Sequence, residues 1–169
     1  MVTASALAII ALAATAGCSS SGEKRDYTVP SSLCGMAVPS GELRTFLPAG
    51  SKISVQDTTP VDRTKRCIVT VDGDRALVAS REWWEKKDDI ATVAFAHSQV
   101  KTGELGDRGR ILYSELGAVG KTRCVDAAHP EDVLYVAVEA YNEGSKNAPG
   151  MKKLIASYTN AVESSSDCR

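Results

Sequence analysis

Long apolar runs and an excess of positive charge are both missing from this chain. Its one extended apolar stretch covers residues 4–16, which is shorter than the roughly 20 residues that a membrane-spanning helix needs. The 20 lysine and arginine residues are balanced by 21 aspartate and glutamate residues, which gives a formal net charge of −1. Nucleic acids and anionic membrane surfaces bind concentrated basic patches, so we expect neither as a charge-driven partner.

Catalytic and metal-binding signatures are scarce as well. The two histidines, His97 and His129, lie in no metal-ligand or catalytic motif, and the G-x-S-x-G pattern of many serine hydrolases is absent. A zinc site needs three or four convergent ligands, and a nucleophilic triad needs a histidine beside an acid and a nucleophile. We expect no catalytic residue, no metal site and no cofactor, and we expect His97 to be a core or edge residue on the apolar side of a helix.

The amino-terminal segment has the features of a bacterial export signal. The apolar run has the length of a signal-peptide core, and it leads into Thr15-Ala16-Gly17-Cys18, which resembles the lipobox of bacterial lipoproteins. In that family the cysteine thiol becomes a thioether to diacylglycerol, and small preceding residues admit the peptidase. We predict a signal peptide over residues 1–17, a lipidated Cys18 with a flexible tether over 18–29, and one extracytoplasmic α+β domain over 30–169. Ordinary cleaved secretion is the first alternative, and a short anchor or a cytosolic start is the second.

Four cysteines remain if Cys18 carries lipid, namely Cys34, Cys67, Cys124 and Cys168. An even number of cysteines in an exported chain indicates disulfides, and four cysteines allow three pairings. We favour Cys34–Cys67 and Cys124–Cys168 because each bond joins neighbours along the chain. Four buried free thiols are the alternative. No C-x-x-C pair is present, which argues against a zinc knuckle or a thioredoxin-like motif.

Hydrophobic periodicity and turn residues predict an α+β fold. The Asp72-Gly73-Asp74 turn between apolar runs predicts a β-hairpin, and Ser40 and Asp88 are the predicted helix N-caps. The predicted helices cover residues 40–47, 89–101 and 151–164, and the predicted strands cover 52–56, 67–71, 75–81, 110–115, 121–126 and 133–141. Residues 57–66, 103–109 and 142–150 are predicted to be loops or turns. Short connections between strands predict a mainly antiparallel sheet, with the three helices packed on one or both faces.

Trp83 and Trp84 are the candidate binding residues. Adjacent residues of a strand point to opposite faces of a sheet, so one indole can enter the core while the other stays near the surface. An exposed tryptophan is a common anchor for a protein partner, and it can also stack on a sugar ring of a wall polysaccharide. The alternative is a structural role for both, with one indole in the core and the other covered by the aliphatic part of Lys86 or Lys87.

The whole pattern resembles small actinobacterial cell-envelope lipoproteins of the LpqN type. The resemblance rests on the lipobox, on the cysteine in Ser32-Leu33-Cys34-Gly35, and on the second cysteine in Lys65-Arg66-Cys67-Ile68-Val69. It implies location at the outer face of the cytoplasmic membrane and a sandwich akin to the Mog1/PsbP fold. The family carries no agreed reaction, so the resemblance implies no chemistry.

These features predict a membrane-anchored binding module rather than an enzyme. Its partners would be the membrane, through the lipid anchor, and an envelope protein or wall component, through a sheet face or loop. A carrier of a small apolar ligand is the first alternative, and it requires a large enclosed apolar pocket. A wall-associated hydrolase is the second, and it requires a cleft that joins a histidine to an acid and a hydroxyl.

Overall fold

The computed structural model describes residues 24–100 and 102–168 of the chain. The predicted signal peptide, Cys18 and the first part of the predicted tether lie outside these residues. Among the described residues, no helix combines the length and the apolar character needed to cross a membrane.

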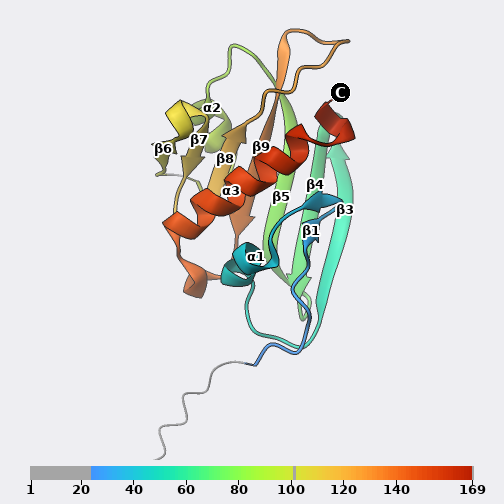
Figure 1. The fold of residues 1–169 in the computed structure, drawn as a ribbon, viewed down its shortest axis with the longest axis vertical. Coiled ribbons are helices and arrows are strands. Elements are labelled where there is room, and N and C mark those ends of the chain that lie inside the picture. Colours follow the sequence, from blue (N-terminus) through green and yellow to red (C-terminus); the bar gives the residue numbers. More distant parts are fainter. Residues whose placement is uncertain (1–23, 101, 169) are drawn as a thin grey trace, which may run out of the picture.

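A seven-stranded sheet forms the centre of the domain (Figure 1). Its strands lie in the order β3-β4-β5-β9-β8-β7-β6, and every neighbouring pair is antiparallel. The bounds of the strands are Ile53–Val61 (β3), Thr64–Val71 (β4), Asp74–Glu85 (β5), Glu104–Gly106 (β6), Ile111–Tyr113 (β7), Gly117–Lys121 (β8) and Asp132–Ala140 (β9). A separate two-stranded sheet pairs β1 (Ser32–Leu33) with β2 (Met36–Ala37).

Three α-helices cover the two faces of the sheet unequally. The helices are α1 (Ser40–Phe46), α2 (Ile90–Phe95) and α3 (Ala148–Glu163), and the single-turn 3₁₀ helices are Asp107–Gly109, Glu143–Ser145 and Ser166–Cys168. Helix α3 crosses in front of the strands in Figure 1, and α1 lies beside it. Both contribute to the main core with the inner side chains of the sheet. Helix α2 packs on the opposite face, where Val93 and Ala94 meet Val119 and Tyr135 in a smaller core.

Part of the second sheet face is left without a helix. In the described chain, α2 contacts β7 and β8 but no helix lies over β3 and β4 on this side. Gln56 and Arg66 are exposed there, and Ile68 and Thr70 are half-buried. We call this area, formed by the outward side chains of β3, β4 and the adjoining part of β5, the open sheet face.

Both predicted disulfides are confirmed. Cys34 bonds to Cys67 and ties the connection between β1 and β2 to β4, while Cys124 bonds to Cys168 and ties the segment after β8 to the chain beyond α3. The predicted hairpin at Asp72-Gly73 is also confirmed, since both residues have positive φ, 51° and 96°, as a type I′ turn requires. The antiparallel α+β class and the three helices agree with the prediction.

The prediction of a loop over residues 57–66 was wrong. Strand β3 continues through Pro60 to Val61, and β4 begins at Thr64. Proline is tolerated because β3 is an edge strand, where the missing N–H breaks no ladder hydrogen bond that the sheet depends on. The turn between them places Arg63 at a φ of 62°. It carries no glycine or asparagine that would have marked it as a turn.

The strand predicted over residues 121–126 was wrong as well, because the strand is β8, Gly117–Lys121. The glycines of β8 do not form a turn; they let neighbouring segments pack closely against the strand. A Cβ at Gly120 would lie 2.4 Å from Oγ1 of Thr159 on α3, and one at Gly117 would lie 2.7 Å from the carbonyl oxygen of Gln99. Part of the turn predicted over 103–109 is β6.

The predicted helix caps also need correction. Asp89, not Asp88, caps α2 by accepting a hydrogen bond from the Thr92 N–H at 2.7 Å, and the helix ends at Phe95 rather than near residue 101. Ser40 is the first residue of α1 and not its N-cap. The N-cap position is Pro39, and no side chain forms a capping hydrogen bond there. The early end of α2 matters for the site, because it frees His97 to turn onto the sheet.

Candidate functional site

His97 occupies the centre of a buried ionic cluster on the second sheet face. The chain turns tightly after α2, with the amide of His97 donating to the carbonyl of Ala94, and the side chain is only 4% exposed. Glu82 on β5 and Glu139 on β9 point to this same face, and Glu139 is paired with Val78, four residues before Glu82. The imidazole fills the gap that this offset leaves between the two carboxylates.

Both ring nitrogens of His97 face a carboxylate. The distance from Nδ1 to Oε2 of Glu139 is 3.2 Å, and the distance from Nε2 to Oε2 of Glu82 is 3.6 Å. Nε2 makes no hydrogen bond, and neither does Oε1 of Glu82, although both atoms are buried. The cluster is therefore held by ion pairing across the ring more than by a saturated hydrogen-bond network.

Neighbouring side chains fix the two carboxylates. Trp84 donates from Nε1 to Oε2 of Glu82 at 3.3 Å. The Ser98 hydroxyl and the Gln99 backbone N–H both donate to Oε1 of Glu139, each at 3.2 Å. Glu139 thus binds the segment that follows α2 to the sheet, and its acceptor atoms are used within the protein.

The charges of the cluster support one another. Burial alone would lower the pKa of His97, but the two carboxylates outweigh it and raise the pKa from 6.5 to about 9. Burial would raise the pKa of Glu82 and of Glu139, and the contacts with His97 outweigh it and lower both. At neutral pH the cluster is accordingly an imidazolium between two carboxylates.

This arrangement does not build a general base. A catalytic triad needs a hydroxyl that donates to a neutral imidazole nitrogen, whereas Ser98 donates to Glu139 and both nitrogens of His97 face acids. A histidine with a pKa near 9 is protonated at pH 7 and cannot accept a proton from a nucleophile. The cluster contains a histidine, acids and a hydroxyl, but the hydroxyl contacts an acid and not the histidine. This arrangement is suited to a structural ion pair rather than to catalysis.

A recess of about 240 Å³ opens beside the cluster on the open sheet face. We call it the sheet-face recess; its lining includes His97, Ser98, Glu139, Tyr141, Ala96, Arg66, Ile68, Arg75 and Val78. The guanidinium of Arg75 lies 5.4 Å from the ring centre of Tyr141. Arg66 and Arg75 are exposed, and neither is ion-paired with a carboxylate of the described residues. The recess therefore combines two free arginines with a buried imidazolium.

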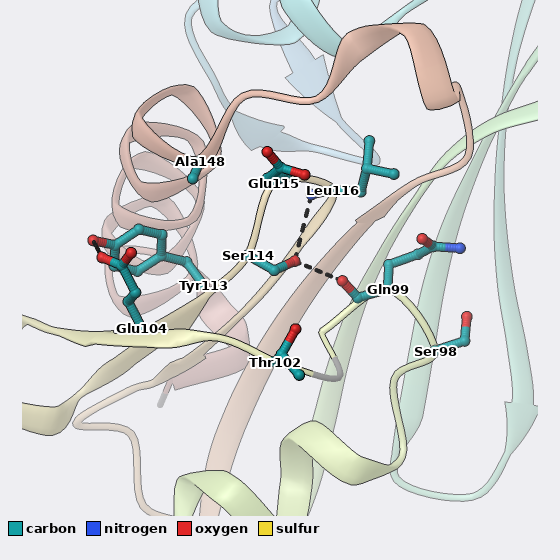
Figure 2. A pocket seen from close by; sticks show the side chains of 9 residues that line it. All are labelled: Ser98, Gln99, Thr102, Glu104, Tyr113, Ser114, Glu115, Leu116 and Ala148. Atoms are coloured by element: carbon teal, nitrogen blue, oxygen red, sulfur yellow. Dashed lines mark hydrogen bonds between the residues drawn. The ribbon is translucent and has the colours of Figure 1, made fainter.

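A second hollow of about 310 Å³ is lined in part by Ser98 and Gln99, which follow α2 (Figure 2). Its wall includes Ser114, whose hydroxyl donates to the carbonyl of Gln99 at 2.6 Å and accepts from the backbone N–H of Leu116. Glu104 and Glu115 make this hollow acidic. Ser98 lines both hollows, so the segment after α2 takes part in the sheet-face recess and in this acidic hollow.

The two tryptophans lie on opposite faces, as the strand pattern predicts, and both are half-buried. Trp83 packs against the main core, and the guanidinium of Arg63 covers it 5.6 Å from the ring centre. Arg63 is held there by Asp132 at 2.6 Å. Trp84 packs against the smaller core and binds Glu82. Both indoles therefore have contacts within the domain, and Trp83 also lines a hollow of about 280 Å³.

His129 lies in an exposed group with Glu131 and Asp132, whose potential ligand atoms are within 4.8 Å of one another. The Asp132 carboxylate is already paired with Arg63.

Glu82 and Glu139 were missed as candidates. The alternation of β9 could have identified Glu139, because it falls on the face of Val133, Tyr135 and Ala137, where a charge needs a partner. Glu82 lies just beyond the strand predicted over 75–81.

The fold and the site together define an antiparallel α+β sandwich with a buried ionic cluster and a cationic recess on one sheet face. No family model, no curated protein and no solved structure matches this chain. The resemblance to LpqN-type lipoproteins therefore stays a prediction from the sequence.

Proposed function

We propose that this protein is a lipid-anchored, extracytoplasmic binding module of the cell envelope, akin to the LpqN-type lipoproteins, and not an enzyme. Diacylglycerol on Cys18 holds it at the outer face of the cytoplasmic membrane. Two features support export: the lipobox-like sequence that ends at Cys18, and the two disulfides, which persist in oxidising compartments and are rare in reducing ones.

The observation that carries the proposal is the open sheet face with its recess. Helices cover the sheet elsewhere, while β3 and β4 present side chains such as Gln56 and Arg66 to solvent. A recess with free arginines beside a rigid, buried cluster is suited to hold a polar partner without reorganisation. The partner is an envelope protein or a wall component that meets this face.

The two alternatives fit the described residues less well. An apolar-ligand carrier needs a large enclosed cavity, and the most apolar hollow, beside Phe95 and Leu112, has a volume of about 230 Å³ and opens to solvent. A hydrolase needs a neutral histidine next to a nucleophile, and both ring nitrogens of His97 face carboxylates.

Site-specific photo-crosslinking in cells tests the binding face. A benzoylphenylalanine at Gln56, on the open sheet face, should give a discrete adduct with an envelope protein or wall fragment. The matched control places the same group at Lys153, an exposed residue of α3 on the other side of the sheet. Equal adducts from both positions, or none from Gln56, would contradict the proposed binding face.

Membrane fractionation tests the anchor separately. The wild-type protein should sediment with membranes, and its mature form should carry diacylglycerol on Cys18. The Cys18→Ser variant should lose the lipid and the sedimentation. Wild-type protein in the cytoplasm with its leader intact and its thiols free would overturn the proposed location.

A further inference from the structure

We infer that the sheet-face recess binds the anionic group of a small ligand or chain end, either a carboxylate or a phosphate ester, between Arg66 and Arg75. The inference rests on the proposed binding function and specifies the chemistry that the recess recognises.

The charged groups at the recess favour an anion. Arg66 enters it from β4 and Arg75 from β5, and the His97 imidazolium contributes from the segment after α2. Against these three cations stand Glu139 in the wall and Glu82 behind the imidazole. Both carboxylates contact His97, whose single positive charge offsets one of their two negative charges. Arg66 also interacts with Glu82 and helps to lower its pKa, so the three cations and two carboxylates leave a net charge of about +1 at the recess.

Arg66 and Arg75 form no salt bridge with a carboxylate, whereas most other arginines of the described chain do. Arg63, Arg81, Arg110 and Arg123 each pair with a carboxylate. An unpaired surface arginine is common by itself, and Arg44 on α1 is one such residue. Arg66 and Arg75 are set apart because both line one recess, next to a histidine that is 4% exposed and whose Nε2 atom makes no hydrogen bond.

The shape of the recess limits the ligand to a small group. Its volume of about 240 Å³ is below the range of roughly 300–1,000 Å³ found for drug-sized ligands. Ile68 and Val78 give it an apolar floor, and Tyr141 stands beside Arg75. Guanidinium groups bind carboxylate and phosphate oxygens in pairs, so an anion on a short carbon skeleton, such as a sugar acid or sugar phosphate, matches both the charge and the floor.

Calorimetry on the full-length protein in detergent tests the inference. The probes are inorganic phosphate, glucose 6-phosphate and glucuronate, with glucose as the uncharged control. We expect at least one anionic probe to bind about tenfold more tightly than glucose, with affinity falling as salt is raised. The Arg66→Gln/Arg75→Gln variant should lose about tenfold or more, while Arg44→Gln, which removes one charge from the opposite side, should stay within about twofold.

Purified wall fragments distinguish the two sources of the anion. Retention of the protein on fragments, with release by inorganic phosphate or glucuronate, identifies a chain-bound group; binding of small anions without retention identifies a free ligand. Either outcome supports the inference. It is overturned if no anionic probe binds better than glucose, or if Arg44→Gln weakens binding as much as the double variant. In that case an adduct from Gln56 would still support the binding face, so the two failures can be told apart.

Discussion

Removing the imidazole from the buried cluster should destabilise the protein strongly. In His97→Ala, Glu82 and Glu139, which are 7% and 8% exposed in the wild type, lose the cation between them. Breaking a buried ion pair by deleting one partner costs about 3–5 kcal/mol, because it leaves an uncompensated charge in the interior. The pKa of His97 gives a consistent figure, since its rise from 6.5 to about 9 corresponds to about 3 kcal/mol.

The assay is urea unfolding at about pH 6, followed by tryptophan fluorescence. Its control is His129→Ala, which removes the exposed histidine and should leave the unfolding midpoint unchanged. A third variant, His97→Leu with Glu82→Gln and Glu139→Gln, removes all three charges and should be more stable than His97→Ala. A loss of less than about 1 kcal/mol in His97→Ala would show that the imidazole is not the counter-charge on which the two carboxylates depend.

The contribution of the cluster to folding stability should fall both at high pH and at low pH. Because the pKa of His97 is raised, its contribution is complete below pH 6.5 and is lost as pH rises through about 9. Because the pKa values of Glu82 and Glu139 are lowered from 4.5, their contribution is present above pH 4.5 and is lost as pH falls. The stability difference between wild type and His97→Ala should therefore be largest between these limits and shrink on both sides.

Three further perturbations follow from the fold. Replacing Cys124 and Cys168 by serine removes a bond that closes 44 residues of chain and should cost about 2–4 kcal/mol, seen as a lower urea midpoint; an unchanged midpoint would contradict this. Gly120→Ala should cost about 1–3 kcal/mol, because its Cβ would lie 2.4 Å from Oγ1 of Thr159, and adding Thr159→Ala should recover part of the loss in thermal unfolding. Asn147→Ala should cost about 1 kcal/mol, since Asn147 caps α3 by accepting from the Gly150 N–H; a stability equal to wild type would show that the cap is dispensable.

The sequence predicted correctly those elements that depend on residues close together in the chain. The Asp72-Gly73 turn supplies the positive φ angles of a two-residue hairpin, and the apolar spacing after residue 150 matches the buried face of α3. Sequential cysteine pairing also held, because each bond joins segments that the sheet brings together. The turn at Arg63 escaped detection because an arginine occupies a backbone conformation that glycine usually marks.

The candidate site depended on long-range pairing and was not predicted. His97 meets Glu139 across 42 positions of sequence, and no short motif encodes such a contact. Glu82 enters the site only because β5 extends to Glu85 and pairs with the whole of β9. The glycines of β8 are likewise explained only by the tertiary structure, since what they accommodate lies on α3 and on the segment after α2.

The charge state of His97 is the point on which the non-catalytic site and the cationic recess both depend. An NMR pH titration of ¹⁵N-labelled imidazoles measures it directly, and His129→Gln assigns the signals because the chain has two histidines. We expect His97 to titrate near pH 9, with both ring nitrogens protonated at pH 7. A neutral His97 ring at pH 7, titrating at or below 6.5, would contradict it.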